Sequence, residues 1–466
     1  MNRRFHRCGT WTLVIALAGG IAFAQGDPDL RRGFPVQTYE TGGSYQAGHG
    51  IHVLVGDVDG SKRMQIFASG LARGPLYAWG PDGSPTPGWP TGGFDGAVYP
   101  ALGVLSREMP GMQVFSVSYA RENALVARDG AGRTMAGWPR DAANFGSSPA
   151  ALADVDGDGV DEIFVGEEDW GVHAYYADGK RLPGWPVYDY RFGAQQRFTP
   201  AIADIDGDGK PEIAFESNWT TSGQYLFAYH ADGSAVAGFP VRLPSALFAQ
   251  YAVIGDVDGD GELEIVVAAK MEISGRTGVL EVSPSGKLKR SWVAGEFTSY
   301  GPGIALADLD GDRTPEIVVQ SDETLFVWNG CGEPLLGWPR HFPSQRHWDS
   351  APVVGDVDGD GLPDIVVAWP EEVDAFNRCG AALEGFPKGI PMGIPAVPAI
   401  ADLDGNGHNE VILMGEPWDG TAHLYDRVWV LDTSWAHPDA KYGPIEWGQF
   451  QGGPRHQGVY VSPCAR

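Results

Sequence analysis

Aspartate and glutamate recur in this chain with a spacing that could bind metal ions. A nine-residue segment, Asp-Val-Asp-Gly-Asp-Gly-Val-Asp-Glu at 154–162, places carboxylates at its first, third, fifth and ninth positions. Its glycines allow a tight coil, so these side chains and the carbonyl of the seventh residue can converge. Related segments begin at residues 204, 256, 308, 356 and 402. Six copies of one oxygen-rich arrangement predict a set of metal sites.

The ligand types favour calcium. About six oxygen ligands suit Ca²⁺, whereas Mg²⁺ needs stricter octahedral geometry and Zn²⁺ prefers nitrogen or sulfur. A solvated acidic turn would explain one copy but not six, because clustered carboxylates repel one another unless a cation lies between them. Arg313 replaces a glycine in one segment and Asn406 removes a charge from another, and we expect both segments to bind. The decayed copy at Asp57 is not expected to bind.

Each predicted site uses the first, third, fifth, seventh and ninth residues of its segment, the seventh through its main-chain carbonyl. The predicted metal ligands are Asp154, Asp156, Asp158, Val160, Glu162, Asp204, Asp206, Asp208, Lys210, Glu212, Asp256, Asp258, Asp260, Glu262, Glu264, Asp308, Asp310, Asp312, Thr314, Glu316, Asp356, Asp358, Asp360, Leu362, Asp364, Asp402, Asp404, Asn406, His408 and Glu410.

A second marker alternates with the acidic segments. Gly-Trp-Pro or Gly-Phe-Pro occurs at 33–35, 88–90, 137–139, 184–186, 238–240, 337–339 and 385–387, with a worn version at 291–293. Between the markers lie short β-rich runs and turn dipeptides, without helical periodicity. Four strands per unit at a regular period are typical of propeller blades, each stacked between two neighbours. The predicted fold class is all-β, a β-propeller of four-stranded blades, with eight blades expected and seven as the alternative.

The ring is predicted to close through its N-terminus. The last unit has no Gly-Trp-Pro marker, whereas the chain begins with an orphan Gly33-Phe34-Pro35. Residues 33–37 are therefore expected to supply the outer strand of the last blade, which removes an exposed sheet edge. In a short tail from about residue 436, Trp447 to Val461 is expected to pack over that seam.

The N-terminal residues predict export. Three arginines precede an apolar stretch too short to span a bilayer, and Ala22-Phe23-Ala24 offers a cleavage site. Residues 1–24 are thus a predicted signal peptide and 25–466 a single propeller domain, secreted to the exterior or to a bacterial periplasm or cell surface. Cleavage removes the three arginines and lowers the formal charge from −27 to −30. This acidity disfavours nucleic acid as a partner, and no later stretch is apolar enough for membrane insertion.

The acidic segments and their repeat resemble the FG-GAP and VCBS repeat families, which include the propeller of integrin α-subunits. The resemblance covers nearly the whole mature chain. It implies that each acidic loop joins the first two strands of a blade and holds one calcium ion. The Gly-Ala-Pro half of the integrin repeat is absent, since Phe145-Gly-Ser-Ser-Pro and Tyr300-Gly-Pro are only echoes of it. The resemblance therefore predicts no integrin-like partner and fits bacterial extracellular relatives better.

No catalytic constellation is evident, because metalloprotease, nucleophile-elbow, phosphate-loop and dinucleotide motifs are all missing from the sequence. The favoured function is a monomeric, non-catalytic recognition or adhesion module for an extracellular glycan or protein. Two alternatives remain open. Eight-bladed propellers with calcium also occur among rhamnogalacturonan lyases, so a calcium-dependent polysaccharide lyase is one, and a purely structural scaffold is the other.

The ligand is expected on the face opposite the acidic loops. Tryptophans there follow second strands or lie in blade connections, often beside polar residues, which suits stacking on sugar rings or anchoring of a protein. The competing interpretation is that each ring fills a gap between blades. The candidate ligand-binding residues are Trp170, Trp219, Trp348, Trp369 and Trp418.

Overall fold

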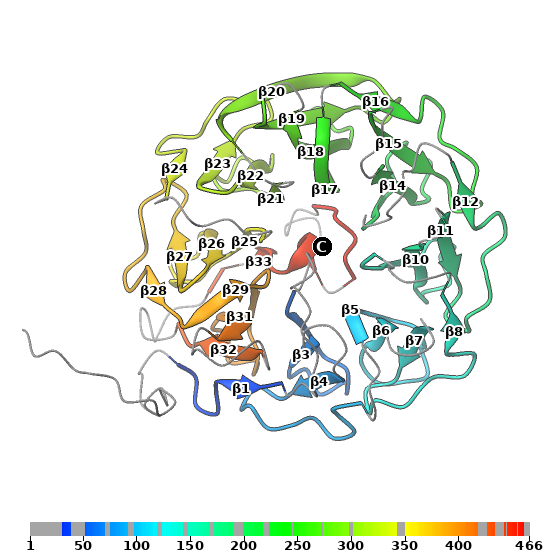
Figure 1. Cartoon of the computed structure of the whole chain (residues 1–466), viewed down its shortest axis with the longest axis vertical. Helices are drawn as coiled ribbons and strands as arrows, with labels where there is room; N and C mark the ends of the chain where they lie inside the picture. The colour runs from blue at the N-terminus through cyan, green and yellow to red at the C-terminus, as the bar shows by residue number, and fades with distance from the viewer. Residues whose placement is uncertain are drawn as a thin grey trace, which may run out of the picture.

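The computed structural model of the chain is built almost entirely of β-strands (Figure 1). It describes residues 30–460 except 39–51, 70–74, 92–96, 119–123, 143–147, 168, 170, 190–198, 218–222, 245, 272–273, 298–301, 343–349, 418–425, 434–441, 444 and 454. The predicted signal peptide at 1–24 lies outside the described residues. In the described part of the chain, no helix has the length and apolar character needed to cross a membrane.

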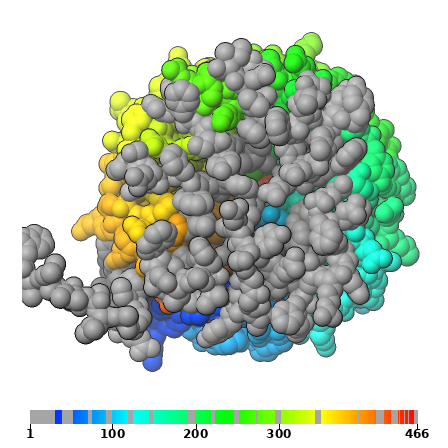
Figure 2. Space-filling view, viewed as in Figure 1, coloured from blue at the N-terminus to red at the C-terminus, as the bar shows by residue number. Residues whose placement is uncertain are grey.

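The described strands form eight antiparallel sheets around a central axis, which confirms the eight-bladed β-propeller (Figure 1). In space-filling view the blades follow one another around the rim in chain order (Figure 2). The first sheet contains β2 (Leu54–Gly56), β3 (Gln65–Ser69) and β4 (Leu76–Trp79). The second contains β5 (Ala97–Gly103), β6 (Gln113–Ser118), β7 (Ala124–Arg128) and β8 (Arg140–Asp141).

Four further sheets have the same four-stranded plan. They are β9 (Ala151–Ala153), β10 (Glu162–Glu167), β11 (Gly171–Tyr175) and β12 (Val187–Tyr188); β13 (Ala201–Ala203), β14 (Glu212–Glu216), β15 (Gln224–Tyr229) and β16 (Val241–Leu243); β17 (Ala246–Gly255), β18 (Glu264–Met271), β19 (Arg276–Val282) and β20 (Leu288–Phe297); and β21 (Gly303–Ala307), β22 (Glu316–Gln320), β23 (Thr324–Trp328) and β24 (Arg340–His341).

The last two sheets each gain a fifth strand. The seventh contains β25 (Val353–Gly355), β26 (Asp364–Trp369), β27 (Glu372–Phe376) and β28 (Lys388–Gly389), and β33 (Ile445–Trp447) pairs with β25. The eighth contains β29 (Met392–Pro395), β30 (Ala399–Ala401), β31 (Glu410–Pro417), β32 (Arg427–Leu431) and β1 (Val36–Gln37).

The second strand of each blade is buried on both faces because a blade lies between two neighbours. In β22, Ile317, Val318 and Val319 have no exposed surface. Such strands read as continuous runs of β-branched residues rather than alternating ones. The acidic segments join the first and second strands, as Ala153 pairs with Glu162 across the loop between β9 and β10. This position is the one that the family resemblance implied.

The Gly-Trp-Pro markers form hydrogen bonds between neighbouring blades. The indole nitrogen of Trp138 donates to the carbonyl of Ala177 at 2.8 Å, and that of Trp185 donates to Ala231 at 2.8 Å. Both rings are buried. The glycine before the tryptophan is required, because at Gly137 (φ +91°) a Cβ would lie 2.0 Å from the carbonyl oxygen of Asp178. The marker is therefore an inter-blade contact.

The N-terminal strand closes the ring as predicted. Val36 of β1 pairs with Val428 of β32, and Gln37 pairs with Arg427. Leu30 forms a further bridge with Leu431. The outer strand of the eighth blade thus comes from the opposite end of the chain, and the edge of β32 is covered.

The C-terminal tail differs from the prediction that it packs over the seam. It runs along the inner strands at the centre of the ring, where the short helix η1 (Phe450–Gly452) follows β33 (Figure 1). The N–H of Leu152 donates to Arg455 at 2.9 Å, and that of Ile202 donates to Gln457 at 2.7 Å. The physical reason is that innermost strands leave N–H groups facing the axis, and the tail accepts hydrogen bonds from them.

Candidate metal centres and the opposite face

Each acidic loop coils around its first aspartate. In the loop 154–162, Asp154 accepts hydrogen bonds from Gly157 and Gly159, both at 2.8 Å. The ninth residue is tied back to the start of the loop, because Glu162 accepts the N–H of Val155 at 3.0 Å. The other five loops repeat this last contact at 2.7–3.2 Å, which holds the buried carboxylate in one place.

The coil brings the predicted carboxylates together. Oxygen atoms of Asp154, Asp156 and Glu162 lie within 4.8 Å of one another, and so do those of three acids in each of several other loops. Such clusters occur at Asp204, Asp206 and Asp208, at Asp256, Asp258 and Asp260, and at Asp308, Asp310 and Glu316. These groups can hold a metal ion, and their donor atoms are the hard oxygens that a divalent cation such as Ca²⁺ takes.

The electrostatics of these loops also fit a cation. Burial, followed by the charges of Asp310, Asp308 and Asp312, raises the pKa of Glu316 to about 8. Burial and the neighbouring aspartates likewise raise the pKa of Glu162 to about 7. A positive ion among the carboxylates would favour their charged form and remove this penalty. These acidic clusters could therefore bind a metal ion, and the full ligand set stays a prediction.

The degenerate loops of the first and second blades show that the loop can fold without an acidic ninth residue. In the first blade, Gln65 replaces the ninth acid and its side-chain oxygen accepts the N–H of Val58 at 2.9 Å. In the second blade, Gln113 accepts from Leu105 at 2.7 Å. A neutral amide thus keeps the structural hydrogen bond without the negative charge. The negative charge at the ninth position of the other six loops is consequently more than this hydrogen bond needs, which supports a ligand role.

Basic side chains reach some of the loops, which the sequence pattern did not indicate. The imidazole of His230 lies 3.1 Å from Glu212 Oε1 and forms a cluster with Asp206. Lys289 contacts the loop at 256–264, and Arg31 contacts the loop at 402–410. These residues come from third, fourth and N-terminal segments of the fold, so only the tertiary structure places them beside the acids.

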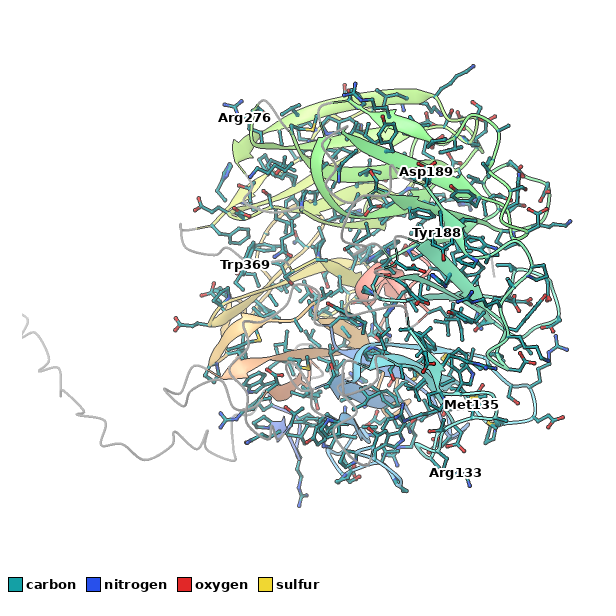
Figure 3. All side chains as sticks on the ribbon, turned by 45° about the vertical axis from the view of Figure 1, so that its right-hand side comes forward. Arg133, Met135, Tyr188, Asp189, Arg276 and Trp369 are labelled. Carbon is teal, nitrogen blue, oxygen red and sulfur yellow. The ribbon has the colours of Figure 1, made fainter. Side chains whose placement is uncertain are left out.

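On the opposite face, the structure corrects one predicted ligand-binding residue. Trp369 ends β26 with only 2 % of its surface exposed, and its ring packs 4.7 Å from that of Phe342 (Figure 3). It therefore fills the core between strands, as the competing interpretation held, and cannot stack on a ligand. Trp170, Trp219, Trp348 and Trp418 lie outside the described residues.

An exposed tyrosine of a blade connection on that face is not among the predicted ligand-binding residues. Tyr188, at the end of β12, is 57 % exposed, and its hydroxyl donates to Asp169 at 2.9 Å (Figure 3). Asp169 also lies 2.9 Å from Nε2 of the buried His173. Beneath them, the Tyr175 hydroxyl donates to Glu167 at 2.9 Å. The four-residue spacing of Asp169 and His173 was visible in the sequence, but their link to Tyr188 depends on the pairing of β11 with β12.

Comparisons with known proteins support the architecture. Residues 154–215 and 308–367 match a family model described as FG-GAP-like repeat. No curated protein sequence matches the chain.

Three solved structures resemble it. The exotype rhamnogalacturonan lyase YesX has 13 % identity and a TM-score of 0.58 over 91 % of this chain and 81 % of that one. The Dos1 propeller has 10 % identity and a TM-score of 0.53 over 86 % and 95 %. The V. cholerae biofilm matrix protein Bap1 has 14 % identity and a TM-score of 0.48 over 90 % and 93 %. At these identities the likeness concerns the fold alone.

Proposed function

We propose that this chain, an eight-bladed β-propeller with FG-GAP-like repeats, is an exported, calcium-binding recognition module for an extracellular glycan or protein. The observation that carries the calcium proposal is the convergence of carboxylates in loops such as 308–316. Export rests on the N-terminal 24 residues, whose character is that of a signal peptide.

Calcium in these loops would act on stability rather than on chemistry. A ligand that binds only the folded state at 100 times its Kd stabilises by about 2.7 kcal/mol per site. Thermal unfolding with calcium and with excess EDTA measures this effect, and we expect a clearly higher midpoint with calcium. The double variant Asp308→Asn, Asp310→Asn should reduce the difference, whereas Asp59→Asn in the worn first loop should not. Identical midpoints in calcium and EDTA would refute calcium binding.

Recognition by the opposite face is supported by Tyr188. The Tyr188 ring packs edge-on to His173 with centroids 6.2 Å apart, yet 57 % of the residue stays exposed, and its hydroxyl is held by Asp169. Aromatic platforms held in one orientation are suited to stacking on sugar rings or to protein contact. The loops at 190–198 and 218–222, outside the described residues, adjoin the same blade ends in sequence.

Binding without catalysis is favoured by the burial of His173. A general base must reach within hydrogen-bond distance of the proton that it removes. The His173 side chain has no exposed surface and lies between Asp169 and Glu167, so it supports the Tyr188 platform instead of facing a substrate. This arrangement weighs against the lyase alternative.

A glycan array tests the recognition proposal. Tyr188→Ala should weaken binding and leave the melting temperature nearly unchanged. Leu336→Ala is the matched control, since Leu336 is 87 % exposed in a turn at the acidic-loop face. Equal loss of binding in both variants would contradict the proposal that the ligand binds on the face opposite the acidic loops. If the protein released unsaturated sugar ends from an acidic polysaccharide, the recognition-module proposal would be wrong and the lyase alternative would be correct.

A further inference from the structure

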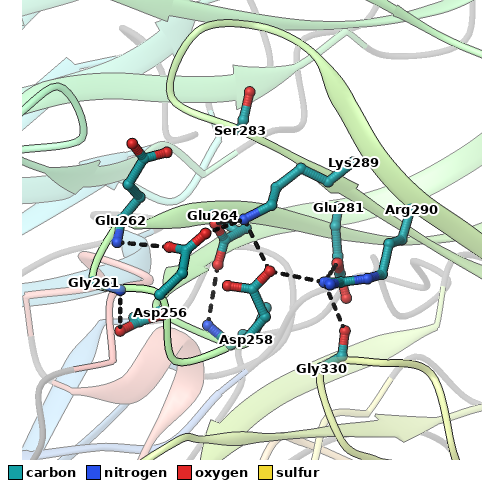
Figure 4. A network of polar contacts seen from close by, with 12 residues as sticks. Asp256, Asp258, Gly261, Glu262, Glu264, Glu281, Ser283, Lys289, Arg290 and Gly330 are labelled. Carbon is teal, nitrogen blue, oxygen red and sulfur yellow. Dashed lines mark hydrogen bonds and ion pairs between the residues drawn. The ribbon is translucent and has the colours of Figure 1, made fainter.

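The six acidic loops are not equivalent, because a lysine enters one of them. The ammonium of Lys289 lies 2.9 Å from Asp258 Oδ2 and 2.8 Å from Glu264 Oε1 (Figure 4). It also lies 2.8 Å from Asp260 Oδ2. These acids hold the third, fifth and ninth positions of the loop, which are metal-ligand positions in the repeat. The ammonium thus lies where the three carboxylates converge.

The fifth blade differs from the other blades around this lysine. The residues at the matching position of the third, fourth and seventh blades, Leu182, Val236 and Leu383, are apolar and belong to the core. The fifth blade also lacks the Gly-Trp-Pro marker, and β20 is 10 residues long instead of ending in a short outer strand. The pairing of β19 with β20 shifts register between Glu281 and Val282. At the position where other blades have a core residue and the fifth blade has lysine, the backbone of the fifth blade therefore also differs.

A second basic residue strengthens the same cluster. Arg290 donates from Nη1 to Asp258 Oδ2 at 2.9 Å and to Glu281 Oε2 at 3.0 Å (Figure 4). Asp258 consequently has two cationic partners. The two positive charges lie among the four carboxylates of the loop and Glu281, so this loop attracts a divalent cation less strongly than a loop without them.

An arginine enters the last loop from the other end of the chain. Arg31 precedes the ring-closing strand β1, and its two terminal nitrogens contact Glu410 and Asp404. This loop already has one carboxylate fewer, since Asn406 stands at its fifth position. Its ninth and third positions are therefore paired with a guanidinium, a fork that matches carboxylates well.

The loop at 308–316 provides the contrast. Its four acids have the same positions, yet within the described residues no lysine or arginine is ion-paired with Asp308, Asp310, Asp312 or Glu316. The loop fold is the same, because Leu309 donates to Glu316 at 2.7 Å and Gly311 donates to Asp308 at 2.7 Å. The difference between the loops is thus the presence of a cationic side chain.

We propose that Lys289 and Arg31 are built-in cations that replace calcium in the loops 256–264 and 402–410, so that the chain binds calcium at four of its six acidic loops. The inference rests on the proposed calcium binding at the other loops. A calcium ion would need the space that the ammonium occupies and would have to displace a charge already neutralising the acids. The replaced loops stay folded without metal.

Counting bound calcium tests this proposal. Equilibrium dialysis of the mature chain with radioactive calcium should give about four ions per chain, and Lys289→Met and Arg31→Met should each give about five, since removing the cation restores an acidic site. The matched controls are the exposed neighbours Lys287→Met and Arg32→Met, which should stay at the native count. Six ions in the native chain, or no gain in Lys289→Met, overturns the inference and leaves the proposed function standing. No bound calcium in the native chain overturns both.

Melting temperatures separate cation replacement from simple structural damage. In EDTA, Lys289→Met should melt lower than the native chain, because three carboxylates lose their partner, and saturating calcium should restore the lost stability. Lys289→Gln should behave in the same way. A loss that calcium does not restore in either variant means that the lysine is only a packing element, which overturns the proposal.

Discussion

Ile254 and Tyr460 are joined through their main chains, with the N–H of Tyr460 donating to the carbonyl of Ile254 at 2.8 Å. The N–H of Ile254 donates in turn to Gly458 at 2.8 Å. Similar bonds run from the innermost strands of other blades to the same tail, including Ile400 to Gly448 at 2.8 Å. Segments at the two ends of the sequence thus contribute to the ring differently: β1 closes its rim, and the tail joins its inner strands.

Removal of the tail should destabilise the whole ring. Each lost main-chain hydrogen bond is worth about 1 kcal/mol, so deletion of residues 445–466 should cost several kcal/mol and lower the melting temperature. Hydrogen exchange should accelerate at the amides of Leu152, Ile202 and Ile254. Deletion of 461–466 alone is the control, because the bonds described here involve residues up to 460. Unchanged exchange at these amides would mean that the tail is dispensable.

The tail also predicts an acid-sensitive stability through His456. This fully buried ring has Nδ1 3.1 Å from the carbonyl of Ala150 and lies edge-on to His52 at 4.6 Å. Burial and the nearby His52 hold the pKa of His456 well below its ordinary value. The folded state therefore keeps it neutral, and stability should be constant above the unfolded pKa of about 6.5 and fall as the pH drops below it.

Urea unfolding between about pH 7.5 and pH 5 measures this slope, which can reach about 1.4 kcal/mol per pH unit for one proton. His456→Gln removes the titrating group and should flatten the acid side of the profile. Leu336→Ala, which changes an exposed side chain that does not titrate, is the control and should retain the native slope. Parallel profiles for native protein and His456→Gln would show that acid sensitivity arises elsewhere.

Deletion of residues 33–37 should open the ring. Val36 and Gln37 would no longer pair with β32, and its exposed edge could pair with another chain. We expect aggregation or larger species in size-exclusion chromatography with light scattering. Deletion of 25–29, which leaves Leu30 and Arg31 in place, should remain monomeric. A monomeric 33–37 deletion with the native melting temperature would contradict the closing role of β1.

The repeated features could be read from the sequence because each appears many times. The position of Glu162 after a tight acidic coil, and of Trp138 between two blades, follows from motifs whose chemistry is local. The same reasoning identified the orphan marker at Gly33 as the missing strand of the last blade. Local patterns that recur at a fixed period therefore predicted the blades, their number, the ring closure and the acidic clusters.

Features that occur once could not be predicted in the same way. Lys289 lies two residues before a degenerate marker, and the shifted register of β20 directs it to Asp260. The tail has no repeat and little strand character, so its course along the inner strands depends on unsatisfied N–H groups that the sequence does not display. In the sequence Trp369 resembles Trp170 and Trp418 in lying near the end of a second-strand pattern, but its burial depends on the contact with Phe342, 27 positions away in the chain.

Trp369→Ala should therefore be a core substitution rather than a binding one. Removing a buried tryptophan leaves a cavity beside Phe342, and such changes cost about 3–5 kcal/mol of unfolding free energy. Denaturant unfolding should show this loss, while Tyr188→Ala on the same face should cost little because its ring is exposed. Trp369→Phe should recover part of the stability by refilling the space. If Trp369→Ala kept the native stability but lost ligand binding, the original interpretation of this residue as a ligand contact would be correct after all.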